Sequence, residues 1–176
     1  MSHECARPSA FSSDVENGLR ADGWTIAEVP AGLTLGVLRG LGAPFRGERY
    51  FREFAPEVVE VPTIATAVAY QPGFLPGSLN LVFDAAASLV DEFDRVVPRG
   101  ARATIASAAA TVYLLWQHAR LTGAFPIAGY YAWTSDLSPA GRLVVGVFGR
   151  ERPLIVAPHA SSGAGVGVLA VLVPRV

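Results

Sequence analysis

The stretch APHASSGAGVGVLAVLVP, residues Ala157–Pro174, decides the fold because a glycine-rich segment leads directly into a long apolar run. In a dinucleotide-binding loop, such glycines follow a strand and open a helix whose N-terminal amides hold the pyrophosphate. Here the residues after the glycines, Val166–Val173, have the composition of a strand. We therefore exclude a dinucleotide-binding loop. Gly163–Gly167 is either an anion-binding nest of amides or, as we favour, a flexible connection between strands.

The chain around this stretch alternates between apolar and polar residues with a period of two. From Gly129 onward this pattern predicts four strands, at residues 129–135, 142–148, 153–157 and 166–173. Short connections of hairpin length predict an antiparallel β-meander. The last two strands are apolar on both faces, so we expect the sheet to be covered on both sides.

Two long helices are expected to pack against this meander. Leu79–Val97 places its apolar residues on one face and its polar residues on the other. Thr104–Leu121 is apolar almost all round and is followed by a capping glycine, Gly123, which predicts a helix in the middle of the protein. In the N-terminal part, the capping box at residues 13–16 predicts the start of a helix. A strand is predicted at residues 24–29, a weaker helix at residues 33–42 and a second strand at residues 58–70.

The predicted fold class is therefore α+β, with an N-terminal strand and helix segment before the two helices and the meander. The chain has 176 residues, which is enough for one domain with a substantial core. We expect residues 1–11 to form a flexible tail and residues 12–176 to form a single domain.

The composition excludes several classes of function. The net charge of −1 gives no general attraction to nucleic acid or to an anionic membrane, and no apolar run reaches the roughly 18–20 residues that span a bilayer. The single cysteine, Cys5, cannot form an intramolecular disulfide, which fits a reducing cytoplasm. We therefore expect a cytoplasmic protein without a nucleic-acid or membrane partner.

The same composition predicts that no cofactor is used. All fourteen basic residues are arginine, so no lysine can form a Schiff base or complete a Walker-type phosphate loop. Three dispersed histidines and one cysteine, without an H-E-x-x-H motif, predict no tightly bound transition metal.

His118 is the first candidate for a catalytic residue. On the second predicted helix it shares one face with Ser107, Thr111 and Leu114, through spacings of four, three and four residues. A polar stripe on a buried helix needs hydrogen-bond partners, either within the protein or from a ligand. The stripe therefore either lines a pocket, with Ser107 and Thr111 binding the ligand, or holds a satisfied core histidine.

His159 is the second candidate, because Ser161 and Ser162 follow it closely. A serine hydrolase would also need an acid that orients the histidine, and Asp136 is the nearest candidate in the predicted topology. The chain has no G-x-S-x-G elbow, and loop serines mostly make local turn hydrogen bonds, so we do not favour a hydrolase of this type.

Two aromatic segments complete the candidate site. On the first meander strand, Tyr131 and Trp133 are predicted to lie on one face and Tyr130 on the other. These aromatic rings either line a pocket or pack in a core. Tyr131 is added to the catalytic candidates, and Tyr130 and Trp133 to the ligand-binding ones. Arg49, in FRGERYFREF, either pairs with Glu53 on a helix or clamps a carboxylate or phosphate.

Two functions remain open. The first is a small cofactor-independent enzyme that acts on an organic molecule by acid and base chemistry, as an isomerase, cyclase, lyase or hydrolase, in a pocket between sheet and helices. The second is a non-catalytic ligand-binding or protein-interaction domain. In either case the high apolar content favours a homodimer that covers part of the sheet.

Overall fold

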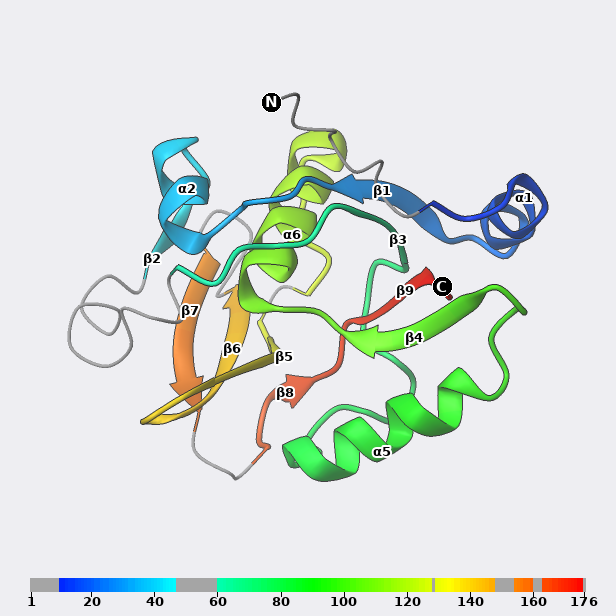
Figure 1. Cartoon of the computed structure of the whole chain (residues 1–176). Helices are drawn as coiled ribbons and strands as arrows, with labels where there is room; N and C mark the ends of the chain where they lie inside the picture. The colour runs from blue at the N-terminus through cyan, green and yellow to red at the C-terminus, as the bar shows by residue number, and fades with distance from the viewer. Residues whose placement is uncertain (1–9, 47–59, 128, 148–153, 160–162, 176) are drawn as a thin grey trace, which may run out of the picture.

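The computed structural model describes residues 10–46, 60–127, 129–147, 154–159 and 163–175, and these form an α+β structure with two sheets (Figure 1). The four-stranded sheet has the order β1-β3-β9-β4 and is antiparallel. The five-stranded sheet has the order β2-β7-β6-β5-β8, in which β2 and β8 run parallel to their neighbours. The strands are β1 Thr25–Val29, β2 Phe45–Arg46, β3 Thr66–Tyr70, β4 Ala101–Ile105, β5 Tyr131–Ser138, β6 Gly141–Val147, β7 Leu154–His159, β8 Val166–Gly167 and β9 Ala170–Pro174.

Four helices lie in the described residues, and three of them begin at a capping side chain. They are α1 Ser13–Ala21, α2 Leu35–Gly40, α5 Phe83–Asp94 and α6 Ala108–Thr122. Ser12, Thr34 and Ser107 cap α1, α2 and α6, each accepting a hydrogen bond from an amide in the first turn. The α6 helix ends at Gly123, whose φ of 77° is the left-handed conformation that glycine adopts readily.

Helix α6 lies between the two sheets, as its apolar composition predicts. On one side Val112 and Leu115 join a core cluster with α2 and the five-stranded sheet. On another side Leu114 packs against β1, β3 and β9 of the four-stranded sheet. The opposite face of the four-stranded sheet packs against α1 and α5, through residues such as Leu19 and Val90. Each large aliphatic side chain that is fully buried contributes ~1.5–3 kcal/mol to the free energy of folding. These clusters therefore supply much of the hydrophobic stabilisation of the fold.

The prediction of a four-stranded C-terminal meander is correct for three strands and wrong for the fourth. Strands β5, β6 and β7 form an antiparallel meander. The predicted single strand at residues 166–173 is two strands: β8 pairs in parallel with β5, and β9 pairs with β3 and β4 in the other sheet. A continuous apolar run suits a strand buried on both faces, but nothing in it marks where the chain passes from one sheet to the next.

The two long helices are both shorter than predicted. Helix α5 begins at Phe83 because the preceding residues are irregular: Asn80 has a φ of 67° and its amide donates to Val166 O at 2.8 Å. Helix α6 begins at Ala108, and the first two residues of the predicted helix, Thr104 and Ile105, are the end of strand β4. Short apolar runs are ambiguous between helix and strand, and here pairing with β9 decided for the strand. Moreover α5 packs mainly against β4 of the four-stranded sheet, and its first turn contacts the meander through Phe83 and Trp133.

The N-terminal predictions hold in outline. The helix, strand and helix are present as α1, β1 and α2, although the capping residue is Ser12 rather than Ser13. The strand predicted at residues 58–70 is β3, which begins at Thr66. Of the predicted tail, residues 1–9 lie outside the described residues, and Phe11 is only 7% exposed within the core.

The glycine-rich segment before β8 is bound to the chain that precedes α5. The Gly165 amide donates to Asn80 Oδ1 at 2.9 Å, and the Val168 amide donates to Ser78 Oγ at 3.0 Å. The Val166 amide donates to Gly163 O at 3.0 Å. These amides are therefore used within the protein, and in its described part the segment is a structural connection rather than an open nest.

Substituting Gly163 is expected to damage this connection more than substituting Gly165. Both glycines have a left-handed φ, 67° and 70°, which costs a side-chain-bearing residue about 1–2 kcal/mol. A Cβ atom at Gly163 would lie 2.6 Å from the Leu81 carbonyl carbon and oxygen, whereas a Cβ atom at Gly165 meets nothing within 4 Å. In urea unfolding, Gly163→Ala should lose several kcal/mol and Gly165→Ala only ~1–2 kcal/mol. Equal losses would contradict the close approach to Leu81.

Candidate functional site

The residues predicted for the site lie in separate parts of the fold. His118, Ser107 and Thr111 belong to α6 and its cap, whereas His159 and Trp133 lie on the meander. Arg49, Ser161 and Ser162 lie outside the described residues. The structure therefore brings His159 together with Trp133 and does not join them to the α6 stripe.

The polar stripe on α6 is satisfied within the protein. Thr111 Oγ1 donates to Ser107 O at 2.8 Å, and Ser107 Oγ accepts from the Ala110 amide at 3.3 Å. His118 Nδ1 lies 3.3 Å from the Tyr70 hydroxyl, with the two rings edge to face. Burial lowers the pKa of His118 and raises the pKa of Tyr70. These contacts account for the stripe as part of the packing between α6 and β3.

Asp136 holds the start of α6 instead of orienting His159. Its Oδ2 accepts a hydrogen bond from the Ala108 amide at 2.7 Å. Burial raises the pKa of Asp136, while the Ala108 amide, the positive charge of Arg142 and a hydrogen bond with Ser135 act in the opposite direction. A carboxylate at a helix N-terminus is a favourable electrostatic arrangement, so the main role of Asp136 is to join β5 to α6.

The two tyrosines pack beside the meander. The Tyr131 ring lies over Gly146, where a Cβ atom would collide with it, and burial raises the pKa of Tyr131. Tyr130 is 44% exposed and meets Phe74 edge to face, with ring centroids 6.1 Å apart. Neither tyrosine lines the cavity that contains His159.

A cavity of about 320 Å³ contains His159, and we call it the His159 pocket. It lies between the first turn of α5 and the meander, where β5, the β5–β6 hairpin and the end of β7 meet. Its lining residues are Val82, Phe83, Asp84, Trp133, Ala140, Gly141, Arg142 and His159. The hairpin approaches β7 closely because Gly141 has no side chain: a Cβ atom there would lie 2.9 Å from His159 O.

The aromatic side of the His159 pocket consists of three rings in contact, those of Phe83, Trp133 and His159. The Trp133 and His159 rings have centroids 5.4 Å apart, and Phe83 meets Trp133 edge to face at 5.8 Å. Trp133 Nε1 donates to Leu81 O at 3.0 Å, which fixes the indole. These contacts place an imidazole against an apolar wall inside a cavity.

The charged groups of the His159 pocket come from both sides. The Arg142 guanidinium stacks on Phe83, with Cζ 3.5 Å from the ring centroid, and Nη1 donates to Ser135 O at 2.7 Å. Asp84 lies in the first turn of α5, which begins without a capping side chain at Val82. The remaining donors of Arg142 suit an anionic group, whereas the Asp84 carboxylate offsets the positive end of the α5 dipole and can accept a hydrogen bond from a donor group.

Among the described residues, His159 Nε2 has no hydrogen-bond partner although it is buried from solvent. Leaving a buried polar atom unsatisfied costs about 1–3 kcal/mol, and such atoms occur where a protein has a catalytic or binding use for them. Because Nε2 has almost no accessible surface, a ligand in the pocket would reach it only after the imidazole ring turns toward the cavity. Local sequence patterns pointed to His159 and Trp133 but not to Asp84 and Arg142, which also line this pocket, because no local motif links positions so far apart in the chain.

Comparison with protein-family models, with curated proteins and with solved structures gives no match. Within the part of the chain that the structure describes, no helix is long and apolar enough to cross a membrane. In the same residues, no group of three or more His, Cys, Asp or Glu side chains is arranged to hold a metal ion. The function is therefore inferred from the residues and their arrangement.

The lowered pKa of His118 predicts a loss of stability in acid. Because the folded protein binds this proton less readily than the unfolded chain, unfolding takes up a proton as the pH falls below about 6.5. The free energy of unfolding of the wild type should therefore fall relative to that of His118→Gln between pH 8 and the lowered pKa. Urea unfolding across this range measures both proteins, and parallel pH curves would contradict the assignment.

Proposed function

We propose that the protein is a small cofactor-independent enzyme that acts on an organic acid by proton transfer in the His159 pocket. The observation that supports this most is that His159, whose buried Nε2 has no hydrogen-bond partner among the described residues, lines a cavity together with Arg142 and Asp84. A neutral imidazole carries one donor and one acceptor nitrogen, so it can take a proton from a substrate and return it. With one cysteine in the chain, we also propose a cytoplasmic location.

Each part of the pocket has a role in this proposal. Arg142 binds the carboxylate or phosphate of the substrate, because its guanidinium forms paired hydrogen bonds with such groups. Asp84 accepts a hydrogen bond from a substrate hydroxyl or amine, and Trp133 with Phe83 packs against its apolar body. His159 exchanges the proton, a step that isomerases, cyclases, lyases and hydrolases share.

Phenylpyruvate tests the proposal, because it carries an aromatic ring, a carboxylate and acidic C3 protons. The wild type should accelerate exchange of these protons with D₂O, measured by proton NMR. His159→Gln should lower the enzyme-dependent rate at least about a hundredfold, the usual contribution of a general base. Arg142→Gln should mainly weaken binding, since it removes the partner of the carboxylate.

His118→Gln is the matched control, because it makes the same substitution at a histidine outside the pocket. It should leave the exchange rate near that of the wild type. If His159→Gln exchanges phenylpyruvate as fast as the wild type, the proposed role of His159 is wrong. Binding of phenylpyruvate without any exchange would favour the alternative of a non-catalytic ligand-binding domain.

The second candidate function is an interaction domain that forms a homodimer. A largely apolar groove of about 250 Å³ lies between α6 and the four-stranded sheet, and Ile64 beside it is 83% exposed. Apolar surface of this kind is a common site of association. We propose that a second copy of the chain covers this groove.

Ile64→Asp tests this homodimer. The substitution should shift the protein from dimer to monomer in sedimentation velocity at micromolar concentration, because a charge would be buried without a partner. Leu121→Asp is the control, since Leu121 is also 80% exposed but does not line the groove. A wild type that is monomeric throughout this range would contradict the proposal.

A further inference from the structure

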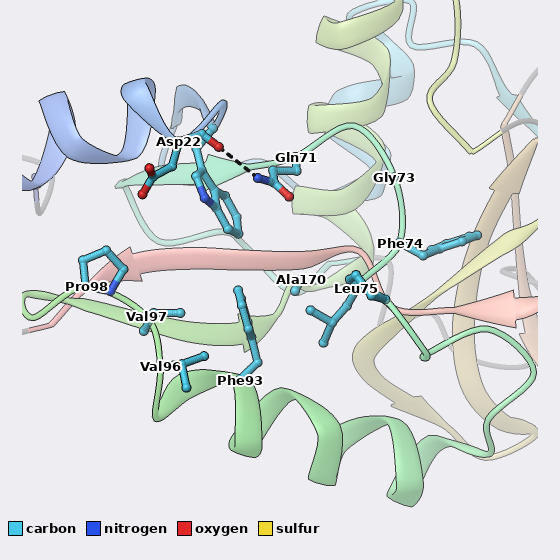
Figure 2. A pocket seen from close by; sticks show the side chains of 12 residues that line it. Asp22, Gln71, Gly73, Phe74, Leu75, Phe93, Val96, Val97, Pro98 and Ala170 are labelled. Atoms are coloured by element: carbon cyan, nitrogen blue, oxygen red, sulfur yellow. Dashed lines mark hydrogen bonds between the residues drawn. The ribbon is translucent and has the colours of Figure 1, made fainter.

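A second cavity lies at the other end of α5 from the His159 pocket. It has a volume of about 330 Å³ and is bounded by the α1–β1 turn, the loop after β3, the end of α5 and the start of β9 (Figure 2). We call it the Trp24 cleft. Its volume lies within the range that small-molecule sites occupy, at the lower end of roughly 300–1,000 Å³.

The wall of the Trp24 cleft is aromatic and apolar. The Trp24 and Phe93 rings are nearly parallel, with centroids 6.1 Å apart and an interplanar angle of 20°. Both rings are half-buried, and Leu75 and Val97 also line the wall. Figure 2 shows Phe93 rising from α5 toward the space beside Leu75 and Ala170. A flat hydrocarbon or aromatic body fits such a surface because aromatic rings favour contact with other rings.

The mouth of the Trp24 cleft presents oxygen atoms. Asp22 and Gln71 are exposed there, and Gln71 Nε2 donates to the Asp22 carbonyl oxygen at 3.3 Å. In Figure 2 the Gln71 nitrogen faces Asp22 while its oxygen points the other way. The Gln71 amide oxygen is therefore available as an acceptor, while the Asp22 carboxylate points away from Gln71 and supplies an exposed negative charge at the mouth.

The charge of the lining is negative. Asp22 is the one ionisable side chain among the described residues that line the cleft, and arginine and histidine are absent from that set. An ammonium group offers three donors to such oxygens, and it is also attracted to the faces of Trp and Phe rings. A carboxylate or phosphate would find no positive partner in this lining. The cleft thus differs from the His159 pocket, whose lining includes both Arg142 and Asp84.

The turn that carries Asp22 and Trp24 is held in place by backbone hydrogen bonds. The Asp22 amide donates to Gly18 O at 3.0 Å, and the Trp24 amide donates to Leu19 O at 2.9 Å. On the other side of the cleft, the Leu75 amide donates to Val168 O at 2.8 Å. Both sides are therefore anchored to regular structure, so that the cleft is formed before a ligand arrives.

From the aromatic wall, the acceptor oxygens and the absence of a basic lining residue, we propose that the Trp24 cleft is a binding site for a small aryl-alkyl ammonium. The aromatic body packs on Trp24 and Phe93, the ammonium group binds the Gln71 amide oxygen, and the exposed Asp22 carboxylate at the mouth attracts its positive charge. This site is separate from the His159 pocket and does not depend on the function proposed there.

Phenethylamine and 3-phenylpropionate test the proposal, because they share a phenyl ring and differ in the sign of the terminal charge at pH 7. Titration of the ¹⁵N-labelled wild type, followed by NMR, should show saturable binding of phenethylamine. The indole N–H signal of Trp24, assigned with Trp24→Phe, should shift, while those of Trp116 and Trp133 should not. The propionate should bind at least about fivefold more weakly, since it is repelled by Asp22.

Asp22→Asn should weaken phenethylamine binding about threefold to fivefold, the effect of an exposed ion pair, and should remove the preference over 3-phenylpropionate. Asp91→Asn is the control, because it removes the same charge from an exposed position on α5 that does not line the cleft. No saturable binding of phenethylamine, equal binding of the two probes to the wild type, or shifts at Trp133 instead of Trp24 would each overturn the proposal. The Trp24 signal of the wild type gives this answer even if a variant does not fold.

Discussion

The backbone hydrogen bonds of Gly163–Val168 are the constraint on which the rest of the structure depends. On one side they join this segment to the chain before α5, through Asn80 and Ser78, and on the other the Tyr131 amide donates to Gly165 O at 2.9 Å. A buried backbone segment must satisfy its polar groups, and this one does so with two parts of the chain at once. It then continues as β9 between β3 and β4, so that one short segment links both sheets.

This link also determines where α5 lies. The residues held by Gly163–Val168 lead directly into α5, and Leu81 O accepts a hydrogen bond from Trp133 Nε1 of the meander. Helix α5 then runs along one face of the four-stranded sheet (Figure 1). Its first turn closes the His159 pocket and its last turn closes the Trp24 cleft. The two proposed sites therefore share one structural element but differ in their charged groups: Arg142 and Asp84 line the first, and Asp22 lines the second.

Polar side chains in this fold divide into those with partners inside the protein and those without. Ser107, Thr111 and Asp136 all bond to backbone groups at the start of α6, so they stabilise the helix that separates the sheets. His118 is near Tyr70. His159 Nε2 is buried and has no partner among the described residues. The contrast explains why His159 is the better candidate for chemistry, although both histidines were candidates from the sequence.

The sequence by itself determined the α+β class, the β5–β6–β7 meander and the central place of α6, because periodicity and capping residues act over a few neighbouring positions. It also predicted His159 and Trp133 as candidate site residues, which the structure places around one pocket. Only the tertiary structure decided that Val166–Val173 divides between two sheets, that Ala101–Ile105 is a strand, and that Asp84 and Arg142 meet His159. The physical reason is that an apolar run can be satisfied by several partners, and the choice among them depends on hydrogen bonds and packing between residues far apart in the chain.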